Sequence, residues 1–369
     1  MTRFHGRSDF RHDEVPRTGI LLTNLGTPDA PTAPALRRYL KEFLSDPRVV
    51  EIPRPLWWLI LNGIVLRTRP ARSAQAYARV WTERGSPLLT HCEDIAQALE
   101  KKLSDRFQGP VTLALGMRYG NPSLQSALEK LRDAGVQRLL VLPLYPQYAS
   151  STTGSTFERI SQILSGWRWI PEFRMVTSYH DEADYIRALA DRILRYWDSN
   201  GRGERLLFSF HGIPKFTFLA GDPYHCHCHK TARLVAARLG LKDEEWFVSF
   251  QSRFGRAEWL KPYTDATLED WGRKGVGDID VVCPGFPADC LETIDEIAFE
   301  NGELFKESGG GQLRYIPALN DDKAHIEALE GLVLRHAAGW PELDRRSEEQ
   351  ARADAQSTLS RARSLGAER

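Results

Sequence analysis

The sequence predicts an α/β protein in which parallel strands are covered by helices on both faces. Short apolar runs alternate with amphipathic stretches along most of the 369 residues, and the runs are apolar at successive positions. A strand buried on both faces needs such a continuous run, because its side chains point alternately to opposite sides. The alternation recurs in both halves of the chain, which indicates a doubly wound architecture in two similar halves.

The individual elements follow from the same patterns. Strands are expected at 20–25, 111–117 and 139–144 in the first half, and at 173–178, 206–210, 247–251, 279–283 and 315–319 in the second. Helical periodicity occurs at 93–107, 122–134, 185–197, 231–239, 289–305 and 323–336. We expect the halves to join between 155 and 171. The predicted division is an extension (1–17), a first domain (18–165), a second domain (166–320), a helix (321–341) and a polar tail (342–369).

Composition excludes several classes of function. Lys+Arg and Asp+Glu both number 49, so no net positive charge favours nucleic acid, and none is expected as a partner. The charged N-terminus lacks the apolar centre of an export signal. The longest apolar segment, 56–66, falls well short of the roughly 20 residues that cross a bilayer. Five cysteines, an odd and sparse set, favour reduced thiols in the cytoplasm.

One histidine stands where a ligand would bind in such a fold. The run 206–210 ends at His211, and Gly212 and Pro214 then end the strand. Ligands of open α/β sheets bind at the carboxyl ends of the strands, so the imidazole of His211 is a candidate functional group. The alternative is a histidine that only satisfies its own hydrogen bonds at the end of a strand.

A second candidate is the acidic segment that follows the strand at 279–283. Asp289 fits a helix N-cap, and Glu292 three residues later completes a pattern typical of a capping box. Capping does not account for Glu296 and Glu300, which continue at four-residue steps along one face of an α-helix. These acids form either a solvated face or a route for metal ions or protons.

Two further segments attract attention. His225, Cys226, His227, Cys228 and His229 are five consecutive residue types that bind metals, but their spacing differs from structural zinc sites, and alternate side chains of a helix point apart. The hydroxyl-rich loop 144–154 follows a strand and lacks the glycine and lysine pattern of a phosphate loop. No GxGxxG motif follows the first strand, which argues against a dinucleotide cofactor.

Taken together, five segments resemble the ferrochelatase family between about residues 18 and 329. They are GILLTNLGTPD (19–29), LPLYPQYASSTTG (142–154), LLFSFHGIP (206–214), FQSRFGRAEWLKPYTD (250–265) and VVCPGFPADCLETIDEI (281–297). The resemblance implies two Rossmann-like domains with a porphyrin cleft between them. It also implies the insertion of ferrous iron into protoporphyrin IX, which forms protohaem and releases two protons in haem biosynthesis.

The resemblance also implies roles for particular residues. His211 and Glu292 match the positions assigned to iron binding and to removal of the pyrrole protons, and Glu296 and Glu300 match a helical acidic ladder. The segment 56–66, which we name the apolar lip, matches the mouth of the cleft and could touch a membrane transiently. Six further positions match residues around the macrocycle: Leu25, Arg118, Tyr119, Tyr145, Trp259 and Phe286.

Some family members carry a [2Fe–2S] cluster, which needs four thiolates. No cysteine follows Cys290, and Ser150 occupies the remaining ligand position, so we expect neither an animal-type cluster nor a tightly bound cofactor. An internal cluster of the five cysteines stays open. So do a chelatase for another metal or tetrapyrrole, a porphyrin-binding or iron-carrying module, and coproporphyrin as the substrate. The order of metal binding and proton removal is also open.

Overall fold

The computed structural model describes residues 4–255, 257–344 and 347–368, and its framework is two parallel sheets. The first sheet has the order β2-β1-β3-β4, and the second has the order β6-β5-β7-β8, which is the same arrangement of successive strands. The first sheet comprises β1 (Arg17–Thr27), β2 (Val111–Gly120), β3 (Val136–Pro143) and β4 (Glu172–Met175). The second comprises β5 (Arg205–His211), β6 (Trp246–Gln251), β7 (Ile279–Val282) and β8 (Leu313–Tyr315). The expected fold class is confirmed.

The continuous apolar runs mark the strands at the centre of each sheet. Ile20, Leu21 and Leu22 on β1 are all fully buried, and Ile20 lies in register with Leu113 of β2 and Leu140 of β3. Ile20 and Leu22 face one apolar core, whereas Leu21 faces another on the opposite side of the sheet. The apolar sequence of β1 therefore reflects helices packed on both faces.

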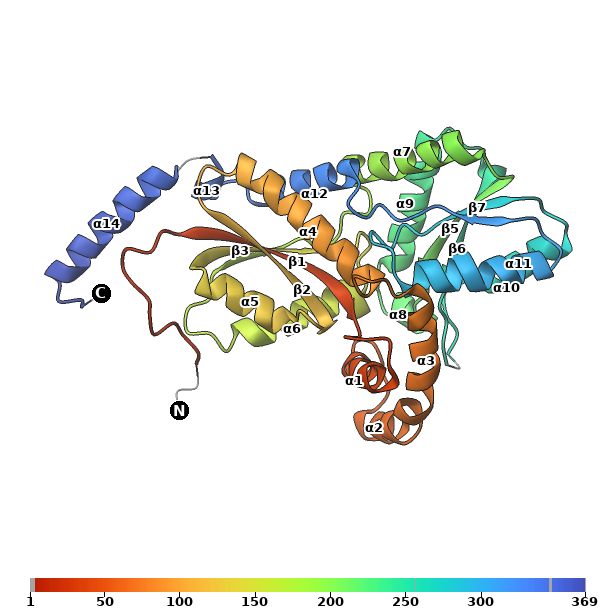
Figure 1. Ribbon diagram of the computed structural model, residues 1–369, viewed down its shortest axis with the longest axis horizontal. Helices are drawn as coiled ribbons and strands as arrows, with labels where there is room; N and C mark the ends of the chain where they lie inside the picture. Colours follow the sequence, from red (N-terminus) through yellow and green to blue (C-terminus); the bar gives the residue numbers. More distant parts are fainter. Residues whose placement is uncertain (1–3, 256, 345–346, 369) are drawn as a thin grey trace.

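Helices cover both sides of each sheet (Figure 1). On the first sheet, α4 (Pro87–Arg106) packs on one face and α5 and α6 on the other. The remaining helices of these two layers are α5 (Leu124–Asp133), α6 (Ser155–Leu164), α7 (Ala183–Asn200), α8 (Lys215–Leu219), α9 (Tyr224–Arg238), η3 (Asp243–Glu245), α10 (Thr264–Arg273), α11 (Gly302–Glu307) and α12 (Lys323–His336).

The strand expected at 173–178 belongs to the first sheet rather than the second. β4 pairs with β3 in parallel, with Phe173 in register with Leu139, so 165–171 is the loop that leads into the last strand of the first sheet. The expected join at 155–171 and the division after residue 165 are therefore wrong. The chain crosses to the second sheet only through α7, and an apolar run alone does not specify which sheet a strand joins.

The two halves share one apolar core. A single cluster of buried side chains includes Leu22 and Leu140 of the first sheet, Phe208 and Val282 of the second, and Leu329 of α12. α12 packs against both α4 and α7 and also contacts β3, so the last long helix of the second half returns to the first. The halves are thus joined by packing as well as by the chain.

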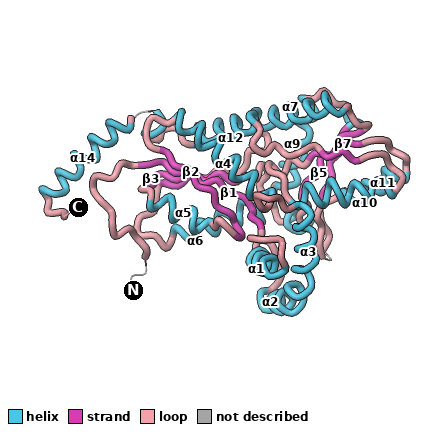
Figure 2. The backbone as a smooth tube through the Cα atoms, in the orientation of Figure 1, coloured by secondary structure: helices cyan, strands magenta, loops and turns pink. Residues whose placement is uncertain are grey.

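Three helices project from the first half at the cleft (Figures 1 and 2). They are α1 (Ala33–Leu44), α2 (Arg54–Ile60) and α3 (Leu66–Val80), with the π-helical turn η1 (Leu61–Val65) between the last two. The apolar lip lies here and is not uniformly exposed. Trp58 is 63% exposed, whereas Trp57 is 7% exposed and donates a hydrogen bond from Nε1 to the carbonyl of Leu44 at 2.6 Å.

The C-terminal segment comprises α13 (Pro341–Asp344) and α14 (Glu348–Ser364). The expected polar tail does not begin at Glu342, because that side chain is 1% exposed. Its carboxylate accepts hydrogen bonds from Arg138 at 2.6 Å and from Thr18 at 3.2 Å, which fastens α13 to the first sheet. A buried acid with two partners is a structural tie that composition does not reveal.

Candidate active site

A cavity of about 650 Å³ opens where the carboxyl ends of the second sheet meet the projecting helices. This volume is typical of a site for a small molecule. Residues of both halves and of α1 and α3 line it, among them Tyr39, Phe43 and Ala76. Most of the expected site residues also line it: Leu25, Tyr145, His211, Trp259, Phe286, Glu292, Glu296 and Glu300.

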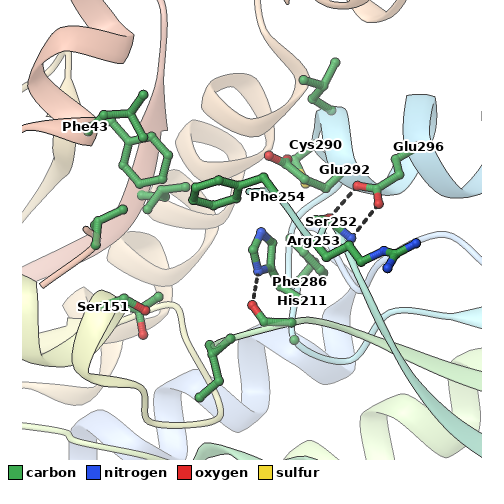
Figure 3. A pocket seen from close by; sticks show the side chains of 18 of the residues that line it. Phe43, Ser151, His211, Ser252, Arg253, Phe254, Phe286, Cys290, Glu292 and Glu296 are labelled. Carbon is green, nitrogen blue, oxygen red and sulfur yellow. Dashed lines mark hydrogen bonds between the residues drawn. The ribbon is translucent and has the colours of Figure 1, made fainter. Parts of the chain in front are cut away.

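His211 is the last residue of β5 and reaches the cavity from the strand end. Its Nδ1 lies 2.6 Å from the carbonyl oxygen of Gly212 (Figure 3). A carbonyl only accepts, so Nδ1 carries the proton and Nε2 keeps a free lone pair. The rings of Trp259 and Phe286 flank the imidazole, with centroids 6.2 Å and 6.4 Å away. His211 is thus oriented with one basic nitrogen available to a ligand.

Gly212 makes the turn after this strand possible. A Cβ at this position would approach Trp259 to 3.0 Å and the carbonyl oxygen of Gln251 to 3.1 Å. The amide of Gly212 also donates a hydrogen bond to that carbonyl at 2.8 Å. The absence of a side chain therefore lets the strand end pack against Trp259 and hold His211 at the cavity.

Glu292 begins a π-helix, η4 (Glu292–Asn301), rather than an α-helix that starts at Asp289. The expected capping box is wrong, because the N-cap position is Leu291 and no side chain caps the helix. The carboxylate of Asp289 instead accepts hydrogen bonds from the side chains of Thr293, Tyr315 and Asn320 at 3.0, 2.5 and 2.8 Å. Asp289 anchors the start of η4, which leaves the carboxylate of Glu292 on the cavity (Figure 3).

The π-helical form explains how three acids share one cavity. Backbone hydrogen bonds in a π-helix join residues five apart, so each turn is wider than in an α-helix. Positions four apart therefore fall slightly short of a full turn, and Glu292, Glu296 and Glu300 stay on the side that lines the cavity. Such helices often occur at functional sites. Side-chain periodicity predicts the stripe but does not distinguish the two helical forms.

Glu296 is the most perturbed carboxyl of this stripe. It accepts hydrogen bonds from the backbone amide of Ser252 at 2.7 Å and from the Ser252 hydroxyl (Figure 3). Burial, the largest cause, and the nearby Glu292 carboxylate raise the pKa of Glu296 to about 7, although both hydrogen bonds oppose the shift. Ser252 has a φ of +66°, a conformation uncommon for residues other than glycine. Glu296 is therefore poised to exchange a proton near neutral pH.

Arg79 of α3 neutralises part of the acidic stripe. Its guanidinium forms two hydrogen bonds of 2.7 Å with the buried carboxylate of Asp295 and one of 3.2 Å with Glu300. Glu300 is more than half exposed, so this end of the stripe faces solvent. The sequence analysis missed Arg79 and Asp295, since their pairing joins positions 216 residues apart.

Cationic side chains also line the cavity and were not singled out from the sequence. Arg69 and Arg72 reach it from α3, Arg48 from the loop after α1, and Arg253 from the loop after β6. The guanidinium of Arg69 lies 5.8 Å from the centroid of the Phe254 ring. Burial and the neighbouring Arg72 lower the pKa of Arg69, although a guanidinium stays charged. The clustering of basic residues after the apolar lip was the available signal.

Arg118 and Tyr119 do not line the cavity, contrary to expectation. Tyr119 is fully buried and donates a hydrogen bond from its hydroxyl to Asp46 at 2.8 Å. Arg118 also pairs with Asp46 and donates from Nε to the Ser155 hydroxyl at 2.7 Å. Asp46 therefore holds both side chains behind the cavity wall, where Tyr119 packs against the ring of Phe43.

The loop after β3 completes the wall on the side of the first sheet. Tyr145 lines the cavity, and its buried hydroxyl makes no hydrogen bond with a described residue. The π-helical turn η2 (Ser150–Gly154) follows, and the amide of Ser150 donates to Asp222 at 2.7 Å. This hydrogen bond ties the loop of the first half to the start of α9 in the second.

Comparison with known proteins agrees with this site. The family model for Ferrochelatase matches residues 17–337. A protein of Thioalkalivibrio sulfidiphilus named Ferrochelatase is 60% identical over 364 residues, covering 99% of this chain and 98% of its own. One of Nitrosococcus oceani with the same name is 60% identical over 341 residues, covering 92% of each.

Solved structures show the same fold at much lower sequence identity. SirB from Bacillus subtilis with Fe3+ has a TM-score of 0.52 at 13% identity, and the match covers 89% of this chain and all of that one. A sirohydrochlorin chelatase SirB in complex with cobalt has a TM-score of 0.51 with the same coverage. From the length of the family match and the identity to its members, the chain belongs to the ferrochelatase family.

Proposed function

We propose that the protein inserts ferrous iron into protoporphyrin IX, forming protohaem and releasing two protons. The observation that carries this proposal is that His211 and Glu292 line one cavity in a chain matched by the ferrochelatase model over residues 17–337. A passive porphyrin carrier would not need a basic imidazole nitrogen and a carboxylate at the same cavity. Porphyrin and Fe²⁺ are both substrates in this proposal.

The cavity wall suits a flat, largely apolar macrocycle with acidic substituents. Leu25, Trp259 and Phe286 offer apolar and aromatic surface, and burial of such surface supplies most of the binding free energy. Arg69 and Arg72 would pair with the propionates, since guanidinium groups bind carboxylates in two parallel hydrogen bonds. Binding against curved walls would also favour a bent ring, which exposes the nitrogen lone pairs.

Metal insertion exchanges two pyrrole protons for one divalent cation. Imidazole and carboxylate both ligate Fe²⁺, and each accepts a proton near neutral pH or below. His211 presents a free Nε2 lone pair, and Glu292 presents a carboxylate. In this proposal His211 and Glu292 act on iron and on the pyrrole protons, and Glu296 takes protons onward. Glu300, paired with Arg79 at the exposed end, connects the stripe to solvent.

We expect no animal-type [2Fe–2S] cluster and no tightly bound cofactor. Position 150, which corresponds to a cluster ligand in such enzymes, is serine, and its hydroxyl accepts a hydrogen bond from Arg48 at 3.0 Å. Cys92, Cys228, Cys283 and Cys290 are buried and Cys226 is exposed. Within 4–255, 257–344 and 347–368, no three side chains of His, Cys, Asp or Glu are grouped to hold a metal ion.

We also propose a cytoplasmic location with transient contact between the apolar lip and a membrane surface. No helix of the described segments is long and apolar enough to cross a bilayer. The lip nevertheless exposes large apolar side chains, with exposed fractions of 53–63%: Leu56, Trp58, Leu59 and Ile64. A patch of this kind beside the site of a poorly soluble substrate fits interfacial binding.

The substrate assignment is tested by an anaerobic insertion assay with purified protein and Fe²⁺. Protoporphyrin IX and coproporphyrin III are compared at equal concentration, and metalloporphyrin formation is followed by absorption. We expect kcat/KM for protoporphyrin IX to be about tenfold higher or more, a difference of about 1.4 kcal/mol in transition-state binding. A preference for coproporphyrin III, or formation of no iron porphyrin, would contradict the proposal.

A further inference from the structure

The metal-binding residue types at the start of α9 separate into two groups on the helix. His227 faces the first half, where its ring stacks on His180 with centroids 3.6 Å apart and an interplanar angle of 7°. Its Nδ1 accepts a hydrogen bond from the backbone amide of Tyr148 at 3.2 Å. Parallel stacked rings direct their nitrogens side by side rather than toward one ion, so this pair is structural.

His225 and His229 form the second group and lie on another face of the same helix. They are four residues apart, and their ring centroids are 4.4 Å apart with an interplanar angle of 46°. Two histidines at this spacing on a helix are neighbours that can bind one metal ion together, as in helical zinc motifs. A zinc–imidazole bond is about 2.0–2.1 Å long, so only small side-chain rotations would let both rings share an ion.

The surroundings restrict the two rings and leave their nitrogens available. The ring of His225 lies between Phe218, with centroids 5.0 Å apart, and Phe250, with centroids 5.9 Å apart, and His229 lies 6.2 Å from Phe250. Within the described segments neither imidazole hydrogen-bonds another residue. Burial lowers the pKa of both histidines, and His225 lowers that of His229 further, so both are neutral ligands at pH 7.

We propose that His225 and His229 form a second metal site, separate from the active-site cavity, that binds a divalent transition-metal ion such as Zn²⁺. Two imidazoles supply the protein ligands, and water completes the coordination, since no third His, Cys, Asp or Glu of the described segments joins them. Imidazole sites bind Ni²⁺, Cu²⁺ and Zn²⁺ more tightly than Fe²⁺, so the site would take these ions in preference to the substrate metal.

The site lies immediately behind the cavity wall. Tyr224, the residue before His225, lines the cavity, but neither His225 nor His229 does. Iron insertion without added Zn²⁺ should therefore proceed equally well when the pair is removed. The proposal does not depend on the reaction in the cavity.

The test is calorimetric titration of Zn²⁺ into protein whose cavity ligands are removed by His211→Ala and Glu292→Gln. In this parent we expect one remaining Zn²⁺ site. Adding His225→Gln and His229→Gln should weaken its affinity about tenfold or more. Two matched controls, His336→Ala on α12 and Cys226→Ser on the same turn of α9, should change it less than about twofold.

Absent Zn²⁺ binding in the parent, or unchanged affinity in the histidine variant, would overturn the proposal. So would an equal loss in the Cys226→Ser control, because the ligand would then be the thiolate. Melting curves without metal establish that each variant is folded. Zinc X-ray absorption on the parent provides a measurement independent of the histidine variants. We expect two imidazoles per Zn²⁺ there, and one or none would contradict the assignment.

Discussion

At the scale of single residues, Glu296 has the protonation behaviour that the reaction needs. Its carboxyl is buried beneath Glu292 and is held by the amide and hydroxyl of Ser252. Burial raises its pKa to about 7, so the protonated and ionised forms coexist at physiological pH. A group with this property can take a proton from one side and release it on the other without a large free-energy penalty.

Glu296→Gln should remove a limb of the pH–rate profile. In the unaltered protein, turnover should rise with pH through about 7 as Glu296 loses its proton and becomes an acceptor. Glutamine keeps the size of the side chain but does not titrate, so turnover should be lower and nearly flat across that range. The measurement is kcat for iron insertion between pH 6 and 8.5. A variant with the same rising limb would assign the proton acceptor to another group.

The same variant predicts a pH-dependent difference in stability. The pKa of Glu296 in the folded state, about 7, exceeds its usual value of 4.5, so ionisation destabilises the folded protein. The free energy of unfolding should therefore fall, relative to Glu296→Gln, as the pH rises from 4.5 to 7, by up to about 3 kcal/mol. Denaturant unfolding at several pH values measures this difference. A difference that does not change with pH would show that Glu296 titrates normally.

At the scale of elements, η4 sets the order of the three acids from cavity to solvent. Glu292→Gln should abolish turnover while porphyrin still binds, because it removes the carboxylate at the reacting centre. Glu296→Gln should lower turnover less, and Glu300→Gln least, because that carboxylate is exposed and solvent can replace it. Steady-state kcat and porphyrin fluorescence titrations test this gradient. Equal, small effects at all three positions would mean that η4 presents only a solvated face.

The apolar lip should separate into a structural part and a surface part. Trp57 is buried and hydrogen-bonded to Leu44, so Trp57→Ser should cost about 3–5 kcal/mol of stability. Trp58 is 63% exposed, so Trp58→Ser should change stability by less than about 0.5 kcal/mol but reduce binding to phospholipid vesicles. Thermal melting and vesicle sedimentation distinguish the two. Unchanged vesicle binding in the Trp58 variant would remove the lip from any membrane contact.

The sequence indicates which segments reach the site more reliably than which side chains do. A histidine at a strand end and an acidic stripe are local patterns, and both His211 and Glu292 line the cavity. The burial of Arg118 and Tyr119 depends on Asp46, more than 70 positions away, so no local pattern reveals it. Strand periodicity likewise identifies β4 but not its partner, because pairing is decided by distant contacts.

At the scale of the whole molecule, the shared core couples the two sheets. The cluster that includes Leu140 and Phe208 runs between them, and α12 packs on helices of both halves. We therefore expect one cooperative unfolding transition rather than two, although the chain contains two sheets. Differential scanning calorimetry measures this as the ratio of calorimetric to van't Hoff enthalpy, with a value near one expected. Two resolved transitions would mean that the halves unfold independently.

The cleft exists only because both halves contribute to it. His211 and Glu292 come from the second half, Tyr145 from the first, and Arg69 from the projecting helices. A rigid connection between the halves keeps these groups at fixed separations, which metal insertion requires because the ion must be passed between ligands of defined geometry.

The central claim, that His211 acts on the metal or the pyrrole protons, is tested most directly by His211→Ala. Turnover of protoporphyrin IX with Fe²⁺ should fall by about 100-fold or more, because the variant lacks the only nitrogen base that we place at the reacting centre. Its melting temperature and porphyrin affinity should stay close to those of the unaltered protein, and His336→Ala serves as the matched control. Near-normal turnover in a folded His211→Ala protein would contradict the account.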